Sequence, residues 1–85
     1  ALYHERYAWF HNQVKSGSYP NSRHLAERFE ISRRTAKRLI TFMRDRLFAP
    51  LAYDPANRGY RYTDNTFELP HIPVEVEGLG EVVAE

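Results

Sequence analysis

The 85-residue sequence contains no cysteine. Without thiols the chain cannot form a disulfide or a thiolate zinc finger, and it cannot use thiol catalysis. No apolar run approaches the roughly 20 residues of a membrane span, and no secretory signal pattern is present. A chain of this length makes one small domain, and we expect that domain to work in the reducing cytoplasm rather than at a membrane.

Side-chain sets for catalysis or metal binding are also lacking. Four histidines occur, at positions 4, 11, 24 and 71, and only His4 and His11 share a predicted helix face. Two imidazoles alone make a poor metal site. No serine occupies a nucleophile-elbow pattern, and no glycine-rich phosphate loop is present. We therefore expect no enzymatic activity, no metal and no cofactor.

Basic residues are absent from the last part of the chain. All 12 Lys and Arg lie in residues 1–62 beside five acidic residues, which gives this part a charge of +7 (12 − 5). Residues 63–85 hold the other six acidic residues and no base, so their charge is −6 and the sum is the +1 of the whole chain. The near-neutral total conceals a basic domain and an acidic tail. A basic surface attracts phosphates whatever their sequence, whereas the acidic tail is expected to stay off nucleic acid.

The spacing of apolar residues predicts three helices, over residues 2–16, 23–29 and 33–48. Gly17 can end the first helix in the left-handed region. Ser22 and Ser32 are candidate N-caps of the second and third helices, because a serine hydroxyl accepts a hydrogen bond from an N–H of the first turn. Residues 30–32 form a short turn, from which Ile31 should point into the core. The second and third helices therefore read as a helix-turn-helix.

The third predicted helix has an apolar stripe and a basic face. The stripe recurs at i, i+3, i+4, i+7 and i+11 and consists of Ala36, Leu39, Ile40, Met43 and Leu47. At about 100° per residue, the side chains that project opposite the stripe are those of Arg34, Lys37, Arg38 and Thr41. Arg33 and Arg44 lie on its flank. A helix with outward basic residues near its N-terminus can enter a DNA major groove.

Two short strands, residues 51–53 and 60–62, should flank a turn-rich loop. Their tyrosines, Tyr53, Tyr60 and Tyr62, are expected to pack beneath this hairpin, with stacking on bases as the alternative, and Arg61 is expected on the opposite face. The segment 19–21 is extended before its proline and occupies the place of the short first strand of a winged helix. The fold class predicted is mainly α with a small β-hairpin, a winged helix-turn-helix over residues 1–64. Residues 65–85 are predicted to be an acidic linker, or the start of a C-terminal domain beyond this chain.

We predict DNA contacts from the third helix and its cap, from the start of the second helix, and from the hairpin or wing. Arg34 and Lys37 are expected to read bases, since both side chains can reach guanine O6 and N7, and Arg33 is expected to bind phosphate. A helix N-terminus can hold a phosphate through its N–H groups, which places the start of the second helix near the backbone. The full predicted set is Ser22, Arg23, Ser32, Arg33, Arg34, Thr35, Lys37, Arg38, Thr41, Asn57, Arg58 and Arg61.

Two segments of this chain resemble a known family. LAERFEISRRTAKRLITFMRD (residues 25–45) and APLAYDPANRGYRYTD (residues 49–64) look like the N-terminal winged-helix domain of WYL-domain transcriptional regulators, which overlaps the DeoR-type group. The tail LPHIPVEVEGLGEVVAE resembles the link that leads into their ligand-sensing domain. The resemblance implies a bacterial or phage DNA-binding regulator that forms a homodimer and binds its effector through a domain beyond Glu85.

The chain departs from the family pattern at the positions that would read DNA. Lys37-Arg38 stands where the family often has Arg-Asp, so no base preference is carried over. Arg58-Gly59-Tyr60 replaces the usual Gly-Gly-Tyr.

The sequence thus predicts sequence-specific binding of double-stranded DNA by a nucleoid-associated regulator. We expect a repressor acting as a homodimer on an inverted repeat. The alternative is a winged helix that contacts another protein and does not read DNA. Salt dependence separates the two, because binding through phosphates weakens steeply as salt rises.

Overall fold

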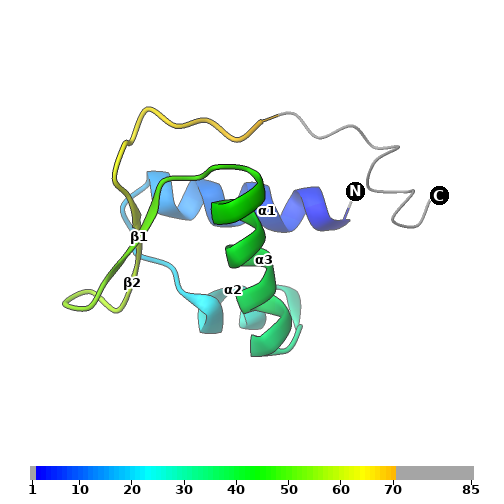
Figure 1. Cartoon of the computed structure of the whole chain (residues 1–85). Coiled ribbons are helices and arrows are strands. Elements are labelled where there is room, and N and C mark those ends of the chain that lie inside the picture. Colours follow the sequence, from blue (N-terminus) through cyan, green and yellow to red (C-terminus); the bar gives the residue numbers. More distant parts are fainter. Residues whose placement is uncertain (1, 71–85) are drawn as a thin grey trace.

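Three helices are followed by a two-stranded hairpin in the computed structural model, which describes residues 2–70 (Figure 1). Leu51 pairs with Tyr62 and Tyr53 with Tyr60 in an antiparallel register. The predicted fold class, a winged helix-turn-helix, is confirmed. The elements are α1 (Leu2–Lys15), α2 (Ser22–Phe29), α3 (Arg33–Arg46), β1 (Leu51–Asp54) and β2 (Gly59–Tyr62).

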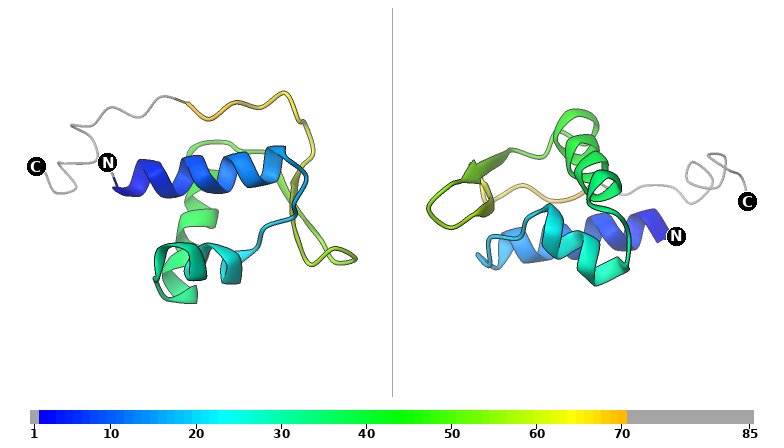
Figure 2. Two further views of the ribbon diagram at one scale, coloured as in Figure 1. Left: turned by 180° about the vertical axis from the view of Figure 1, so that it is seen from behind. Right: turned by 90° about the horizontal axis from the view of Figure 1, so that it is seen from below.

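The core lies where α1 and α3 cross, with α2 and the hairpin closing its sides (Figures 1 and 2). Phe10 and Met43 are fully buried at its centre, and Ile31 packs against it from the turn between α2 and α3. The apolar stripe predicted for the third helix is therefore the one that α3 buries. The buried apolar side chains are Tyr7, Phe10, Val14, Leu25, Ala26, Ala36, Leu39, Ile40, Met43, Ala49 and Tyr62.

The predicted ends of α1 and α3 hold in part. Gly17, at φ +80°, ends α1 as predicted, because Ser18 N–H donates to the Gln13 carbonyl at 3.2 Å in the pattern of a Schellman motif. Ser32 caps α3, and its Oγ accepts from Thr35 N–H at 3.0 Å. The prediction that the third helix reaches residue 48 was wrong by two residues. The helix ends at Arg46 because Phe48 adopts the left-handed region at φ 60° and Ala49 N–H donates back to the Met43 carbonyl at 3.0 Å, which closes the last turn.

Ser22 does not cap α2, contrary to the sequence-based prediction. Asn21 does so, since its Oδ1 accepts from His24 N–H at 3.0 Å and His24 Nδ1 accepts from Asn21 N–H at 3.1 Å. This reciprocal pair is a capping box. Ser22 is instead the first helical residue and is buried.

The segment 19–21 lies beside the hairpin but is not a strand. Its link to β2 is a hydrogen bond from Tyr60 N–H to the Pro20 carbonyl at 2.8 Å. Pro20 has no N–H with which to extend a ladder. Gly59 lies so close to this segment that an added Cβ would stand 1.9 Å from the Tyr19 carbonyl oxygen.

Among residues 2–70, four non-glycine residues with left-handed backbone stand at the joints between elements. Tyr19 (φ 54°) precedes α2, and Glu30 (φ 56°) follows it. Phe48 (φ 60°) follows α3, and Arg58 (φ 56°) ends the wing loop, residues 55–58 between the two strands. Each costs on the order of 1 kcal/mol relative to an unstrained backbone. The joints are therefore held in place by the packing of the elements that they connect.

After β2 the chain returns over α1 as a strap of residues 63–70 (Figures 1 and 2). Phe67 and Leu69 pack against the core. Lys15 Nζ donates to the Asn65 carbonyl at 2.7 Å and to Glu68 Oε2 at 3.0 Å. The predicted boundary after residue 64 stays a prediction, and most of the acidic tail, residues 71–85, lies outside the described residues.

His11 connects α1, β2 and the strap. Its buried ring lies 2.7 Å from the Tyr62 hydroxyl through Nδ1 and 3.6 Å from Glu68 Oε1 through Nε2. Burial lowers the pKa of His11 below its ordinary value of 6.5, against the opposing attraction of Glu68. The neutral ring with its proton on Nε2 suits both neighbours, because Nδ1 then accepts from the Tyr62 O–H.

We predict that Gly59→Ala destabilises the domain by about 2 kcal/mol or more, because the new Cβ must displace the Tyr19 backbone. Gly17→Ala is the matched control. Its Cβ would meet nothing within 4 Å, so only left-handed strain of about 1 kcal/mol is expected. Urea unfolding followed by the fluorescence of Trp9, the single tryptophan, measures both. A cost for Gly59→Ala no larger than that for Gly17→Ala would contradict the close approach.

We also predict that the free energy of unfolding falls as the pH drops below about 6.5. The pKa of His11 is lowered in the folded state, so the unfolded chain binds more protons in this range and protonation favours unfolding. Unfolding measured between pH 8 and pH 5 keeps the carboxylates ionised. The decline should be smaller in His11→Gln, and an identical pH profile in that variant would argue against His11 as its source.

Candidate nucleic-acid interface

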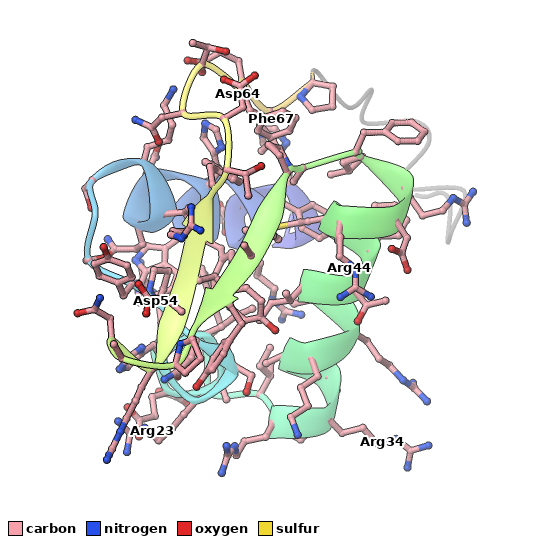
Figure 3. The ribbon with its side chains drawn as sticks, turned by 60° about the vertical axis from the view of Figure 1, so that its left-hand side comes forward. Arg23, Arg34, Arg44, Asp54, Asp64 and Phe67 are labelled. Atoms are coloured by element: carbon pink, nitrogen blue, oxygen red, sulfur yellow. The ribbon has the colours of Figure 1, made fainter. Side chains whose placement is uncertain are left out.

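The starts of α2 and α3 share one edge of the molecule. Figure 3 shows Arg23 and Arg34 extending from that edge, while Asp64 and Phe67 lie at the opposite end. The wing loop also lies toward this edge, beyond the ends of β1 and β2 (Figure 1). The fold therefore collects the three regions from which DNA contacts were predicted.

The outward face of α3 is basic, as its spacing predicted. Arg34, Lys37, Arg38 and Thr41 are all exposed. Together with three residues farther along the helix they border a shallow hollow of about 660 Å³, here named the outer hollow. The other three residues are Phe42, Asp45 and Arg46.

The cations at the start of α3 are not paired with other side chains among the described residues. Within the described part of the chain, none of Arg33, Arg34, Lys37 and Arg38 takes part in an ion pair or hydrogen bond. Arg44, on the same helix, differs because its Nε donates to Asp45 at 3.0 Å. Free guanidinium and ammonium groups are available to an anion without first breaking a contact.

A second hollow, of about 350 Å³, separates α3 from the wing. Lys37 and Thr41 border this wing hollow as well as the outer hollow, so these two residues form a ridge between them, here named the α3 ridge. An α-helix with its side chains is about 10–12 Å across, which matches the roughly 12 Å width of the major groove. The residues that border the wing hollow are Asn21, Ser22, Arg33, Lys37, Thr41, Tyr53 and Tyr60.

Asn21 is a site residue that the sequence-based prediction missed. Its Nδ2 donates to the Arg58 carbonyl at 2.8 Å, which joins the start of α2 to the wing. The same amide caps α2. The signal was present in the sequence as Asn21-Ser-Arg-His24, a capping box in which histidine replaces the more usual glutamate.

The wing loop is held by Asp54. Its Oδ1 accepts from Ala56 N–H at 3.0 Å and its Oδ2 accepts from Asn57 Nδ2 at 3.0 Å. These hydrogen bonds, chiefly the one from the Asn57 side chain, lower the pKa of Asp54. The Asn57 side chain is thus engaged within the loop, whereas the Arg58 side chain is exposed and available.

The remaining predicted contact residues lie at the starts of α2 and α3 and on the hairpin. Ser32 and Thr35 bond to each other, Oγ to Oγ1 at 3.0 Å, in the cap of α3. Arg23 is exposed at the start of α2. Arg61 is exposed on the hairpin face opposite Tyr60 and Tyr62, as its alternation predicted, and it borders neither hollow.

The expected packing of the three hairpin tyrosines holds for two of them. Tyr62 is 6% exposed and Tyr60 is half-buried against the core, but Tyr53 is 52% exposed. The prediction for Tyr53 was wrong because α1 packs against β2, and on β1 Leu51 packs against the core while Tyr53 lies farther along the strand and is exposed. Period-two alternation predicts on which face of the hairpin a residue lies, but it does not predict whether a helix covers that part of the face.

Within residues 2–70, no helix has both the length and the apolar composition to cross a membrane. No three or more His, Asp or Glu residues gather there in a way that could hold a metal ion.

Comparison of the chain with protein-family models, with curated proteins and with solved structures gave no match. The resemblance to WYL-domain regulators therefore stays a prediction from the quoted segments.

Proposed function

We propose that this domain binds double-stranded DNA sequence-specifically by placing α3 in the major groove. The observation that carries the proposal is the set of uncommitted cations at the start of α3, beside a wing that borders the same surface. A structural role would pair such cations with neighbouring carboxylates, as Arg44 is paired with Asp45.

Phosphate neutralisation supplies the sequence-independent part of this binding. Arg33 borders the wing hollow and Arg38 the outer hollow, so the two lie on opposite sides of the α3 ridge. Each is suited to one backbone strand at the edge of the groove. Arg58 at the wing tip and Arg23 at the start of α2 extend the basic surface beyond α3.

Base reading is assigned to the first turns of α3, because recognition helices contact base edges near their N-termini. Arg34 and Lys37 are exposed there without partners and can reach guanine O6 and N7. Thr41 completes the α3 ridge one turn later and can contact a base or a backbone group.

The resemblance to WYL-domain regulators supports assigning this activity to a bacterial or phage transcriptional regulator in the cytoplasm. In that setting a homodimer would bind an inverted repeat with half-sites about one helical turn, or a multiple, apart. Repression follows most directly from such occupancy. Effector binding would belong to a domain outside this chain.

The test begins with selection from a randomised duplex library at physiological salt. An enriched motif is expected, and Arg34→Ala should then lose about 1–3 kcal/mol of binding free energy and relax preference at one base pair. Arg44→Ala is the matched control, since its side chain lies on the same helix but is paired with Asp45. It should change binding little.

Three outcomes would redirect the proposal. Equal weakening of all sequences by Arg34→Ala would make Arg34 a phosphate contact only. Retention at low salt without any enriched motif would indicate electrostatic binding that does not read bases. No salt-dependent binding to duplex DNA would favour the alternative of a protein-binding winged helix.

A further inference from the structure

The wing hollow has one apolar wall. Tyr53 is 52% exposed, and with Phe48 it forms the pair of large exposed hydrophobic residues among those described. Its ring is nevertheless fixed, because it meets Tyr60 edge to face with centroids 5.3 Å apart, and Tyr60 in turn meets Phe10 at 6.1 Å. The core thus supports one side of the Tyr53 ring and leaves the other open.

The facing wall is polar and positively charged. Arg33 and Lys37 border it without partners in the described part of the chain. Ser22 adds a hydroxyl: the residue is 9% exposed, it borders the hollow, and no hydrogen bond among residues 2–70 engages its side chain. The Ser22 hydroxyl is therefore available to hydrogen-bond a polar group that enters the hollow.

The two walls together suit a ligand that carries an anion beside an apolar ring edge. A free phosphate would bind the cations but make no contact with the Tyr53 ring. A base lies on the floor of the major groove, where it would contact the α3 ridge and not the wing hollow. A sugar–phosphate unit of a nucleic-acid strand has both parts next to each other. Deoxyribose fits the ring better than ribose, whose 2′-hydroxyl would be placed against an apolar surface.

We propose that the wing hollow seats one deoxyribose–phosphate unit, with the phosphate on Arg33, Lys37 and the Ser22 hydroxyl and the sugar against Tyr53. This inference rests on the proposed DNA binding and adds to it a register-fixing contact. Contacts to the backbone orient a protein on the duplex without reading its sequence. Tyr53 is therefore a residue of affinity and orientation, not of base choice.

The salt dependence of DNA binding distinguishes the contribution of the apolar wall from that of the charged wall. Tyr53→Ala removes an uncharged contact, so affinity should fall on the order of tenfold on every sequence while the slope of log affinity against log salt stays the same. Arg33→Ala should reduce the magnitude of that slope by about 1. Tyr53→Phe keeps the ring and should bind nearly as well as the wild type.

The experiment measures binding of the full chain to the selected duplex and to an unrelated duplex over a series of salt concentrations. Phe48→Ala is the matched control, because Phe48 is an exposed aromatic residue that borders neither hollow, and it should leave affinity unchanged. Circular dichroism verifies that each variant is folded. A single 2′-hydroxyl introduced at successive sugars should weaken wild-type binding at one position, and Tyr53→Ala should abolish that difference.

The assignment of the sugar is overturned if Tyr53→Ala binds as tightly as the wild type, or if Tyr53→Phe loses as much affinity as Tyr53→Ala. It is also overturned if the loss is confined to sites with one thymine and disappears when uracil replaces it, since Tyr53 would then read a base methyl. Absence of salt-dependent binding by the wild type would instead defeat the proposed function, and this inference with it.

Discussion

The hydrogen bond from Asn21 Nδ2 to the Arg58 carbonyl joins the helical part of the molecule, at the start of α2, to the wing. Through this amide, the residue that caps α2 also holds the end of the wing loop. The hydrogen bond from Tyr60 N–H to Pro20 and the close approach of Gly59 to Tyr19 reinforce the same junction. The wing hollow exists only while this junction holds, because its walls come from α2, α3 and both strands.

The basic residues of the domain have two different roles, and sequence alone does not separate them. Lys15 binds the strap and Arg44 pairs with Asp45, so both contribute to the folded structure. Arg34 and Lys37 have no such partner among the described residues. The positive charge of residues 1–62 is thus partly structural, and the free part is concentrated at the start of α3.

Most of the fold could be predicted because it depends on local patterns. Apolar spacing, Gly17 and the Ser32 cap each specify geometry within a few residues, and the structure agrees with them. The errors arose where a distant segment decides the outcome. Asn21 rather than Ser22 caps α2, and its amide also reaches the wing. Tyr53 is exposed because α1 packs against β2 and not against the part of β1 that holds Tyr53. The strap contacts of Lys15 span about fifty positions of sequence, and no periodicity reports them.

The left-handed joints at Tyr19, Glu30, Phe48 and Arg58 are points of local frustration, where the preference of the residue opposes the fold that contains it. Such a residue keeps its left-handed backbone only while the packing around it outweighs the strain. Each joint also sets the direction in which an element leaves it. The relative orientation of α2, α3 and the wing therefore depends on the same packing that keeps these joints in place. Because a helix as short as α2 is marginal without tertiary packing, the surface that these elements present to a partner and the helices themselves are expected to be lost together on warming.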